Sequence, residues 1–365
     1  MALRIFSFFS GSGFLDLGFE DSDYRIDLVN EFSPSFRDAY QYARRQMNLP
    51  EPRFGYSEDV NAYLTPEGKR ELHGYIQTIH QEGDLVGFIG GPPCPDFSIA
   101  GKQRGREGDN GRLSQSYINV ILSQTPDFFL FENVKGLWRT AKHRAYYEEL
   151  KQSLSHSYFL TDRLCNALEF GVPQDRDRIL LFGIKKTVAR QRHLNIANFP
   201  WNNHIRYDLE AVKALPWPQQ EPFHIDNHTE IPGGLPEELT VEHWFIQNDV
   251  QHHPNAGDFF TPRAGLARMM AIDEGDDGRK SYKRLHRWRY SPTVAYGNNE
   301  VHLHPYQARR LSAAEAMSLQ SLPANFCLPP DMSLSDKFKT IGNGVPFLLA
   351  RGIAQTILDF IPEEQ

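Results

Sequence analysis

A single thiol stands among turn-forming residues in the stretch Gly90–Ser98, which reads GGPPCPDFS and follows an apolar run. Free cysteines are often small buried hydrophobes, and Pro and Gly mark turns, so Cys94 alone is compatible with a plain turn. Glu132 ends a second apolar run, FFLFENV, where an unpaired carboxylate would be costly to bury. Arg176 and Arg178 come just before a third apolar run, and strand alternation places both on one face.

These residue types suit one reaction in particular. C5 of cytosine is a weak nucleophile, but a thiolate that adds to C6 pushes electron density onto C5, provided that an acid protonates or hydrogen-bonds N3. C5 can then attack an activated methyl group, and loss of the C5 proton restores the base. Cys94 would supply the thiolate and Glu132 the acid, with Arg176 and Arg178 beside the ring. The alternative is structural, with the two arginines serving to neutralise Glu132.

A glycine turn near the start of the chain, in FFSGSGFLDLG, is typical of a site for an adenosine-containing cofactor. Gly11 and Gly13 would let the backbone approach the ligand. Asp16 takes the place of the third glycine of a dinucleotide site, so S-adenosylmethionine fits better than a cofactor with a pyrophosphate. Glu31 would accept the ribose hydroxyls, and Asp59 the adenine amino group. A plain strand-to-helix turn and a solvated loop acid remain the alternatives.

Short apolar runs alternate with helical patterns through the first half, which predicts a parallel sheet covered on both faces. Ser33 and Pro34 are expected to open a helix, and Ser312 with Glu315 predicts a capping box for a helix within ARRLSAAEAMSLQSLP. A Gly-Asn-Gly turn is expected before a final apolar helix. The candidate residues lie beyond the carboxyl ends of strands, where such sheets bind ligands. The expected strands are residues 3–9, 25–31, 84–91, 126–134 and 178–184.

The length of 365 residues predicts two domains, and the texture changes after Lys186. Residues 187–292 lack regular alternation and contain a basic-aromatic segment, GDDGRKSYKRLHRWRYSPT. Its Lys280, Lys283 and Arg284 are predicted to contact phosphates of a nucleic acid, with a solvated surface as the alternative. The net charge of −7 argues mildly against nucleic acid, but a local basic face can coexist with an acidic remainder. Three cysteines fit a reducing compartment, and no apolar run is long enough to cross a bilayer.

The chain resembles the DNA (cytosine-5)-methyltransferase family of prokaryotic restriction-modification systems. The likeness covers nearly the whole chain apart from its irregular middle, and the motifs follow the family's order. They are FSGSGFLDLGFE, NEFSPSFRDAY, EDV, GGPPCPDFS, FENV, GVPQDRDR, ARRLSAAEAMSLQSLP and IGNGVP. The resemblance implies an α/β fold: a Rossmann-like S-adenosylmethionine-dependent methyltransferase sheet with a smaller, irregular target recognition domain. It implies a discontinuous catalytic domain, residues 1–186 and 335–365, and a target recognition domain, residues 187–334.

The resemblance also implies the role of each site residue. Cys94 would be the nucleophile, Glu132 would contact N3 and the amino group of a flipped-out cytosine, and Arg176 and Arg178 would hold its O2 and the active-site loop. The implied cofactor residues for S-adenosyl-L-methionine are Phe9, which stacks on adenine, with Gly11, Gly13, Glu31, Phe32, Asp59, Val60, Pro93, Asn343 and Val345. The implied DNA contacts include Ser98 and Gln174 besides the basic segment. No metal ligands are predicted.

The chain departs from the family pattern at three positions: Pro95 replaces the usual Gln, Ser7 replaces an acid, and Gly344 replaces the usual Ala. Three alternatives stay open: a catalytically silent DNA-binding relative, a tRNA cytosine-5 methyltransferase, and a nicotinamide- or flavin-dependent enzyme. The expected partner is double-stranded DNA, with no membrane. A cognate restriction endonuclease acting separately is an open question. We expect a monomer in the bacterial cytoplasm.

Overall fold

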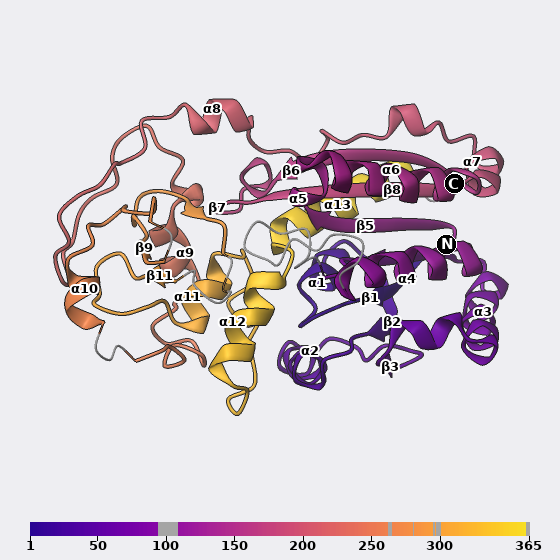
Figure 1. Cartoon of the computed structure of the whole chain (residues 1–365), viewed down its shortest axis with the longest axis horizontal. Coiled ribbons are helices and arrows are strands. Elements are labelled where there is room, and N and C mark those ends of the chain that lie inside the picture. Colours follow the sequence, from indigo (N-terminus) through magenta and orange to yellow (C-terminus); the bar gives the residue numbers. More distant parts are fainter. Residues whose placement is uncertain (94–108, 262–264, 280, 295, 297–300, 363–365) are drawn as a thin grey trace.

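The computed structural model of the chain describes residues 1–93, 109–261, 265–279, 281–294, 296 and 301–362. Its centre is a seven-stranded sheet in the order β3-β2-β1-β4-β5-β8-β6 (Figure 1). The expected strands formed within one to two residues of their predicted ends. The strands are β1 (Leu3–Phe8), β2 (Arg25–Asn30), β3 (Tyr56–Ser57), β4 (Leu85–Gly90), β5 (Phe128–Val134), β6 (Tyr158–Asn166) and β8 (Asp177–Lys185).

The sheet is mixed: the expectation of a parallel sheet holds for the other six strands and is wrong for β8. β8 runs antiparallel to both β5 and β6, whereas β1 pairs in parallel with β2 and β4. The reversal has a consequence for the site. The start of β8 lies at the same edge as the end of β5, and Arg178 pairs with Val134 two residues past Glu132.

Helices cover both faces of the sheet, and each face has its own apolar core. On one face pack α1 (Phe14–Glu20) and α13 (Phe347–Phe360), through Leu15, Phe19 and Ile353 among others. On the other face pack α3 (Pro66–Gln81), α4 (Asp109–Gln124) and α6 (Ala141–Ser155). In Figure 1 the last helix, α13, drawn in yellow, lies among the strands and helices of the first half of the chain.

The second half is far less regular, as expected. Its strands form two-residue parallel pairs, β9 (Lys283–Arg284) with β11 (His302–Leu303), and β10 (Ser291–Pro292) with β7 (Gln174–Asp175). Its short helices are α7 (Lys186–Gln191), α8 (Leu209–Lys213), α9 (Val241–Gln247), α10 (Leu266–Met270) and α11 (Ala313–Ser318), and a further short helix, α5 (Gly136–Arg139), follows β5 in the first half. A third apolar core joins α9 and α11 to α1 and α2 (Pro34–Gln46).

The predicted helix starts are partly confirmed. Pro34 is the first residue of α2 and Ser33 its N-cap, although the Ser33 side chain makes no capping hydrogen bond. Ser312 and Glu315 form the full capping box of α11, but that helix ends at Ser318. The Gly-Asn-Gly prediction is wrong in part, because α12 (Leu334–Asn343) contains Gly342 and Asn343 and the chain turns at Gly344.

Candidate functional site

The glycine turn after β1 has the backbone that its residues predict. Phe9, Gly11 and Gly13 all have positive φ, of 54°, 57° and 88°. A Cβ at Gly13 would lie 2.7 Å from the ring of Tyr40 on α2, so a larger residue would strain both the backbone and this contact. Phe9 is half-buried and meets Tyr117 edge-to-face, with ring centroids 5.9 Å apart. The turn is therefore tightly packed against Tyr40, and its glycines leave backbone atoms uncovered by side chains.

Hydrogen bonds to Glu31 connect this turn to the end of β2. Its two carboxylate oxygens accept hydrogen bonds from the backbone N–H groups of Gly11 and Ser33, each at 2.8 Å. Burial raises the pKa of Glu31, while these two hydrogen bonds act in the opposite direction. Each oxygen keeps a lone pair for a ribose hydroxyl. Beside it, Phe32 is 72% exposed, a position suited to an aromatic ring that covers a ligand.

The predicted adenine side lies at the end of β3. Asp59 is exposed and caps the short 3₁₀ helix Val60–Leu64, its Oδ1 accepting from the Asn61 backbone and side-chain N–H groups. Its Oδ2 is left for another donor in these contacts. Val60, the first residue of this 3₁₀ helix, is buried. Pro93 is half-buried and is the last described residue after β4.

The last predicted cofactor residues lie at the end of α12 and in the turn after it. Asn343 is exposed and Val345 is buried. A hydrogen bond of 2.7 Å between the hydroxyls of Ser12 and Thr340 ties the glycine turn to α12. This brings the first and last motifs together although more than three hundred residues separate them.

Gly344 has a packing reason. A Cβ at this position would lie 2.1 Å from the ring of Phe14, which follows the glycine turn. The alanine that is usual in the family therefore does not fit beside Phe14 in this chain.

The acid and one arginine meet as predicted. Arg178 Nε lies 2.7 Å from Glu132 Oε1, and both side chains are about nine-tenths buried. Burial raises the pKa of Glu132, and the charges of Arg178 and Arg176 oppose this shift. A buried acid with a raised pKa can hold a proton for a ligand at a pH where an exposed glutamate would not.

The segment that carries the predicted nucleophile begins directly against this acid. Gly90 pairs with Phe131 in the sheet, and a Cβ at Gly91 would lie 2.5 Å from Glu132 Oε2. Cys94 itself, with Ser98, lies outside the described residues. The other two cysteines of the chain, Cys165 and Cys327, are buried, and burial raises the pKa of both thiols.

Arg176 and Gln174 do not have the predicted contacts. The Arg176 guanidinium is fully buried and donates to the carbonyls of Val294, Gly342 and Gly344 at 2.9 Å. Gln174 is also fully buried; its amide donates to the Leu319 carbonyl and its oxygen accepts from the Val294 N–H. Both residues join the turn before β8 to the second half of the chain. A contact of Arg176 Nη with the base, or of Gln174 with DNA, is therefore not supported.

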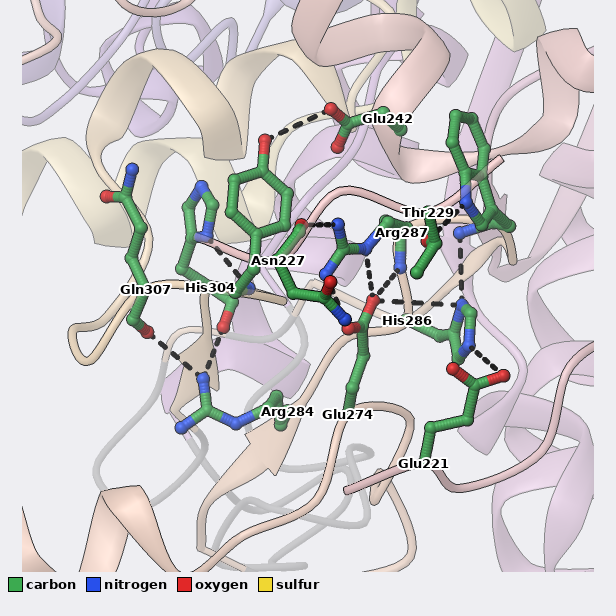
Figure 2. Close-up of polar contacts among 12 residues, drawn as sticks. Glu221, Asn227, Thr229, Glu242, Glu274, Arg284, His286, Arg287, His304 and Gln307 are labelled. Atoms are coloured by element: carbon green, nitrogen blue, oxygen red, sulfur yellow. Dashed lines mark hydrogen bonds and ion pairs between the residues drawn. The ribbon is translucent and has the colours of Figure 1, made fainter. Parts of the chain in front are cut away.

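The prediction of phosphate contacts in the basic segment is also wrong at one position, Arg284. Arg284 is fully buried and donates to the backbone carbonyls of Met269 and Ile272. It also donates to the carbonyls of His304 and Gln307 (Figure 2). It cannot reach a phosphate without leaving these partners. Lys283 is half-buried on β9, and Lys280 lies outside the described residues. The alternation of a strand, which puts neighbours on opposite sides, separates Lys283 from Arg284.

Sequence reasoning missed the group that supports the glycine turn from below. Asp16 is buried and accepts hydrogen bonds from Ser7 at 2.6 Å and from Tyr40 at 2.8 Å. The signal in the sequence is an acid within an otherwise apolar helix, at the position that a third glycine would take in a dinucleotide site. Gln320, buried between Gln174 and the carbonyls of Ile341 and Gly344, was also missed.

A Rossmann-like sheet with a glycine turn, an acid at the end of its second strand and a buried Glu–Arg pair at its carboxyl edge defines an S-adenosylmethionine-dependent methyltransferase fold. The comparisons identify the family. A family described as C-5 cytosine-specific DNA methylase matches residues 3–359. The chain belongs to this family. It is a DNA cytosine-5 methyltransferase, and S-adenosyl-L-methionine is its methyl donor.

Curated relatives match along the whole chain. "Type II methyltransferase M.NmeDI" of Neisseria meningitidis serogroup C is 53% identical over 360 residues, which are 98% of this chain and 84% of the relative. "Type II methyltransferase M.FnuDI" of Fusobacterium nucleatum is 27% identical over 376 residues, covering 98% of this chain and 96% of the relative.

Solved structures share the fold. A DNA modification methyltransferase encoded within a prophage (E. coli) has a TM-score of 0.67 at 21% identity and covers 99% of this chain and all of that one. The S. pombe Dnmt2 methyltransferase has a TM-score of 0.61 at 13% identity, with full coverage of both chains. Membership of the family excludes the nicotinamide- or flavin-dependent alternative.

Proposed function

We propose that Cys94 is the nucleophile, Glu132 the acid at N3 and Arg178 the residue that orients this acid and reaches O2 of a flipped-out cytosine. The observation that carries the proposal is the meeting of Gly91, Glu132 and Arg178 at one edge of the sheet. It places the start of the Cys94 segment against the acid. Because Cys165 and Cys327 are buried with raised pKa values, Cys94 is the remaining thiol for the reaction.

The chemistry then follows from the residues. The Cys94 thiolate bonds to C6, and the electron pair of the C5–C6 double bond shifts toward N3, where Glu132 supplies a proton or hydrogen bond. C5 becomes nucleophilic and takes the methyl group. Loss of the C5 proton to a base then expels the thiolate and regenerates the aromatic ring. When bound, S-adenosylmethionine supplies the electrophilic methyl group. The target base must leave the duplex stack to reach these groups.

The cofactor residues fit this methyl donor. Gly11 and Gly13 offer open backbone, Glu31 has free lone pairs for the ribose hydroxyls, and Phe32 is an exposed ring beside it. We assign Phe9, Asp59, Val60 and Pro93 to the adenine side. Asn343 and Val345 are assigned to the methionine end.

We assign residues 1–186 and 335–365 to the catalytic domain, because α13 packs with α1 on the first-half sheet. Residues 187–334 form the proposed target recognition domain, with Lys283 and Lys280 as candidate phosphate contacts. Ser98 is a further candidate DNA contact. Among the described residues no helix is long and apolar enough to span a bilayer.

The similarity to type II methyltransferases supports a role in a restriction-modification system, where the enzyme protects bacterial DNA from a separate endonuclease. We propose that it acts as a monomer in the cytoplasm.

The experiment is expression of wild type and Cys94→Ala, followed by bisulfite sequencing of plasmid DNA from the same cells. Wild type should leave one short sequence methylated at C5. Cys94→Ala should leave none while the purified protein still binds S-adenosylhomocysteine. Methylation by Cys94→Ala at a tenth of the wild-type rate would refute the assignment.

A further inference from the structure

Asp16 lies beneath the glycine turn, inside a buried polar cluster. Its Oδ1 accepts from the Ser7 hydroxyl at 2.6 Å, and Ser7 lies 2.8 Å from Ser10 within the turn. Its Oδ2 accepts from the Tyr40 hydroxyl at 2.8 Å. The Tyr40 ring is the group that a Cβ at Gly13 would meet at 2.7 Å. Asp16 thus contacts the turn through a hydroxyl on one side and through an aromatic ring on the other.

The cluster contains one more acid than base. Arg44 donates to both oxygens of Glu20, at 2.7 and 2.8 Å, and so neutralises that acid. The contacts of Asp16 in the described residues come from two hydroxyl groups, which carry no charge. When Asp16 is ionised, these two carboxylates and one guanidinium leave a surplus of one negative charge under the turn.

This charge opposes folding. Burial raises the pKa of Asp16 to about 6, and the hydrogen bonds from Ser7 and Tyr40 only partly offset the rise. A carboxyl whose folded pKa lies above its ordinary 3.8 binds a proton more tightly in the folded state, so its contribution to stability falls as the pH rises from about 4 to about 6. Costly buried charges of this kind concentrate at functional sites.

The two forms of the cofactor differ in charge. S-adenosylmethionine carries a positive sulfonium, and the S-adenosylhomocysteine left after methyl transfer has a neutral thioether in its place. A fixed negative charge close to the site therefore favours the donor over the product.

We propose that Asp16 is a positioning residue that holds the glycine turn and whose buried charge makes the enzyme prefer the cationic methyl donor to its neutral product. The inference rests on the proposed assignment of the glycine turn to the cofactor. Its effect would be to help the product leave after each methyl transfer.

The test is isothermal titration of S-adenosylmethionine and S-adenosylhomocysteine into wild type and Asp16→Asn at about pH 8, where an acid with this pKa is ionised. The measured quantity is the ratio of the two dissociation constants. Asn keeps the shape and a hydrogen-bond acceptor but removes the charge. The preference for the donor should fall roughly tenfold, as expected for loss of one nearby charge in a partly buried site. An unchanged ratio in a folded Asp16→Asn protein overturns the proposal.

Two control variants separate charge from structure. Glu67→Gln on α3 removes an exposed acid that pairs with Arg70 outside this cluster, so the ratio should stay within about twofold of wild type. Ser7→Ala loosens the turn without removing the charge, so both ligands should weaken together. A ratio that falls equally in all three variants would show a merely structural role and overturn the proposal.

A second variant keeps the test valid if Asp16→Asn does not fold. In Ser7→Asp/Asp16→Ser the acid moves across the existing hydrogen bond, and the wild-type ratio should return; a ratio as low as that expected for Asp16→Asn overturns the proposal. A wild-type protein that binds neither ligand would instead refute the proposed cofactor site, which is a distinguishable failure.

Discussion

Replacing Glu132 by Gln tests the acid at the centre of the proposed chemistry. The Glu132 carboxylate is buried, with Oε1 held 2.7 Å from Arg178 Nε and Oε2 facing Gly91. Gln keeps the volume and an oxygen for Arg178, so the fold and the base pocket should persist. Its amide can still hydrogen-bond to N3 but cannot release a proton. The loss should therefore be that of a general acid, about 10²–10⁴-fold in the rate of methyl transfer, or about 3–5 kcal/mol in the barrier.

The assay is single-turnover transfer of a labelled methyl group into a duplex containing the recognised sequence, with enzyme in excess. Binding of the same duplex should change little. The control is Glu148→Gln on α6, where the carboxylate is largely exposed and pairs loosely with Lys151 at 3.7 Å. That variant should keep the wild-type rate. A Glu132→Gln rate within threefold of wild type would mean that another group protonates N3.

The same variant has a second readout in its stability. Because burial raises the pKa of Glu132 above its ordinary 4.5, ionisation of this group opposes folding, and the cost grows as the pH rises above about 4.5. Gln cannot ionise. The free energy of unfolding of Glu132→Gln relative to wild type should therefore increase between about pH 4.5 and neutral pH. A difference that stays constant across this range in urea denaturation would contradict the raised pKa.

Further predictions concern the second half of the chain and the nucleophile segment. Arg287→Ala leaves the buried Glu274 without its bidentate partner (Figure 2), and should lower the free energy of unfolding by about 3–5 kcal/mol; an unchanged urea midpoint would contradict this. Lys283→Ala should reduce the log–log salt slope of DNA binding by about one, whereas Arg284→Ala should destabilise the protein and leave the slope unchanged. The reverse result would return Arg284 to the DNA surface. Pro95→Gln should stay within about tenfold of the wild-type rate, because the side-chain amide and the N–H that Gln restores should offset the loss of proline's fixed φ. An adduct with a 5-fluorocytosine duplex in Pro95→Gln but not in wild type would show a disabled enzyme.

The fold was largely readable because strong local signals agree with it. The apolar runs at residues 3–9 and 126–134 became strands, and Pro34 opened α2 where predicted. The direction of β8 was not readable. The sequence of a strand carries no mark of which way it runs. The direction of β8, which lies between β5 and β6, is decided by the connections around it.

The site was readable as a set of residue types but not as a set of contacts. The sequence does not distinguish Arg176 from Arg178, because the two arginines are two residues apart and each follows an aspartate. In the structure one pairs with Glu132 and the other donates to carbonyls more than a hundred residues away. Lys283 and Arg284 are likewise neighbours in a basic run, yet Arg284 is fully buried. Long-range backbone carbonyls, which no sequence pattern displays, make the difference.

Two departures from the family pattern are each explained by a neighbour in space. Ser7 stands where an acid is usual, and Asp16 places its carboxylate 2.6 Å from the Ser7 hydroxyl. Gly344 stands where alanine is usual, and the ring of Phe14 fills the space of the missing methyl group. A single change of Gly344 to Ala would put a carbon 2.1 Å from that ring, so it would require Phe14 to move as well. Both compensating residues belong to α1, directly after the glycine turn. At both positions, a residue of α1 thus occupies the space or makes the contact beside the unusual residue.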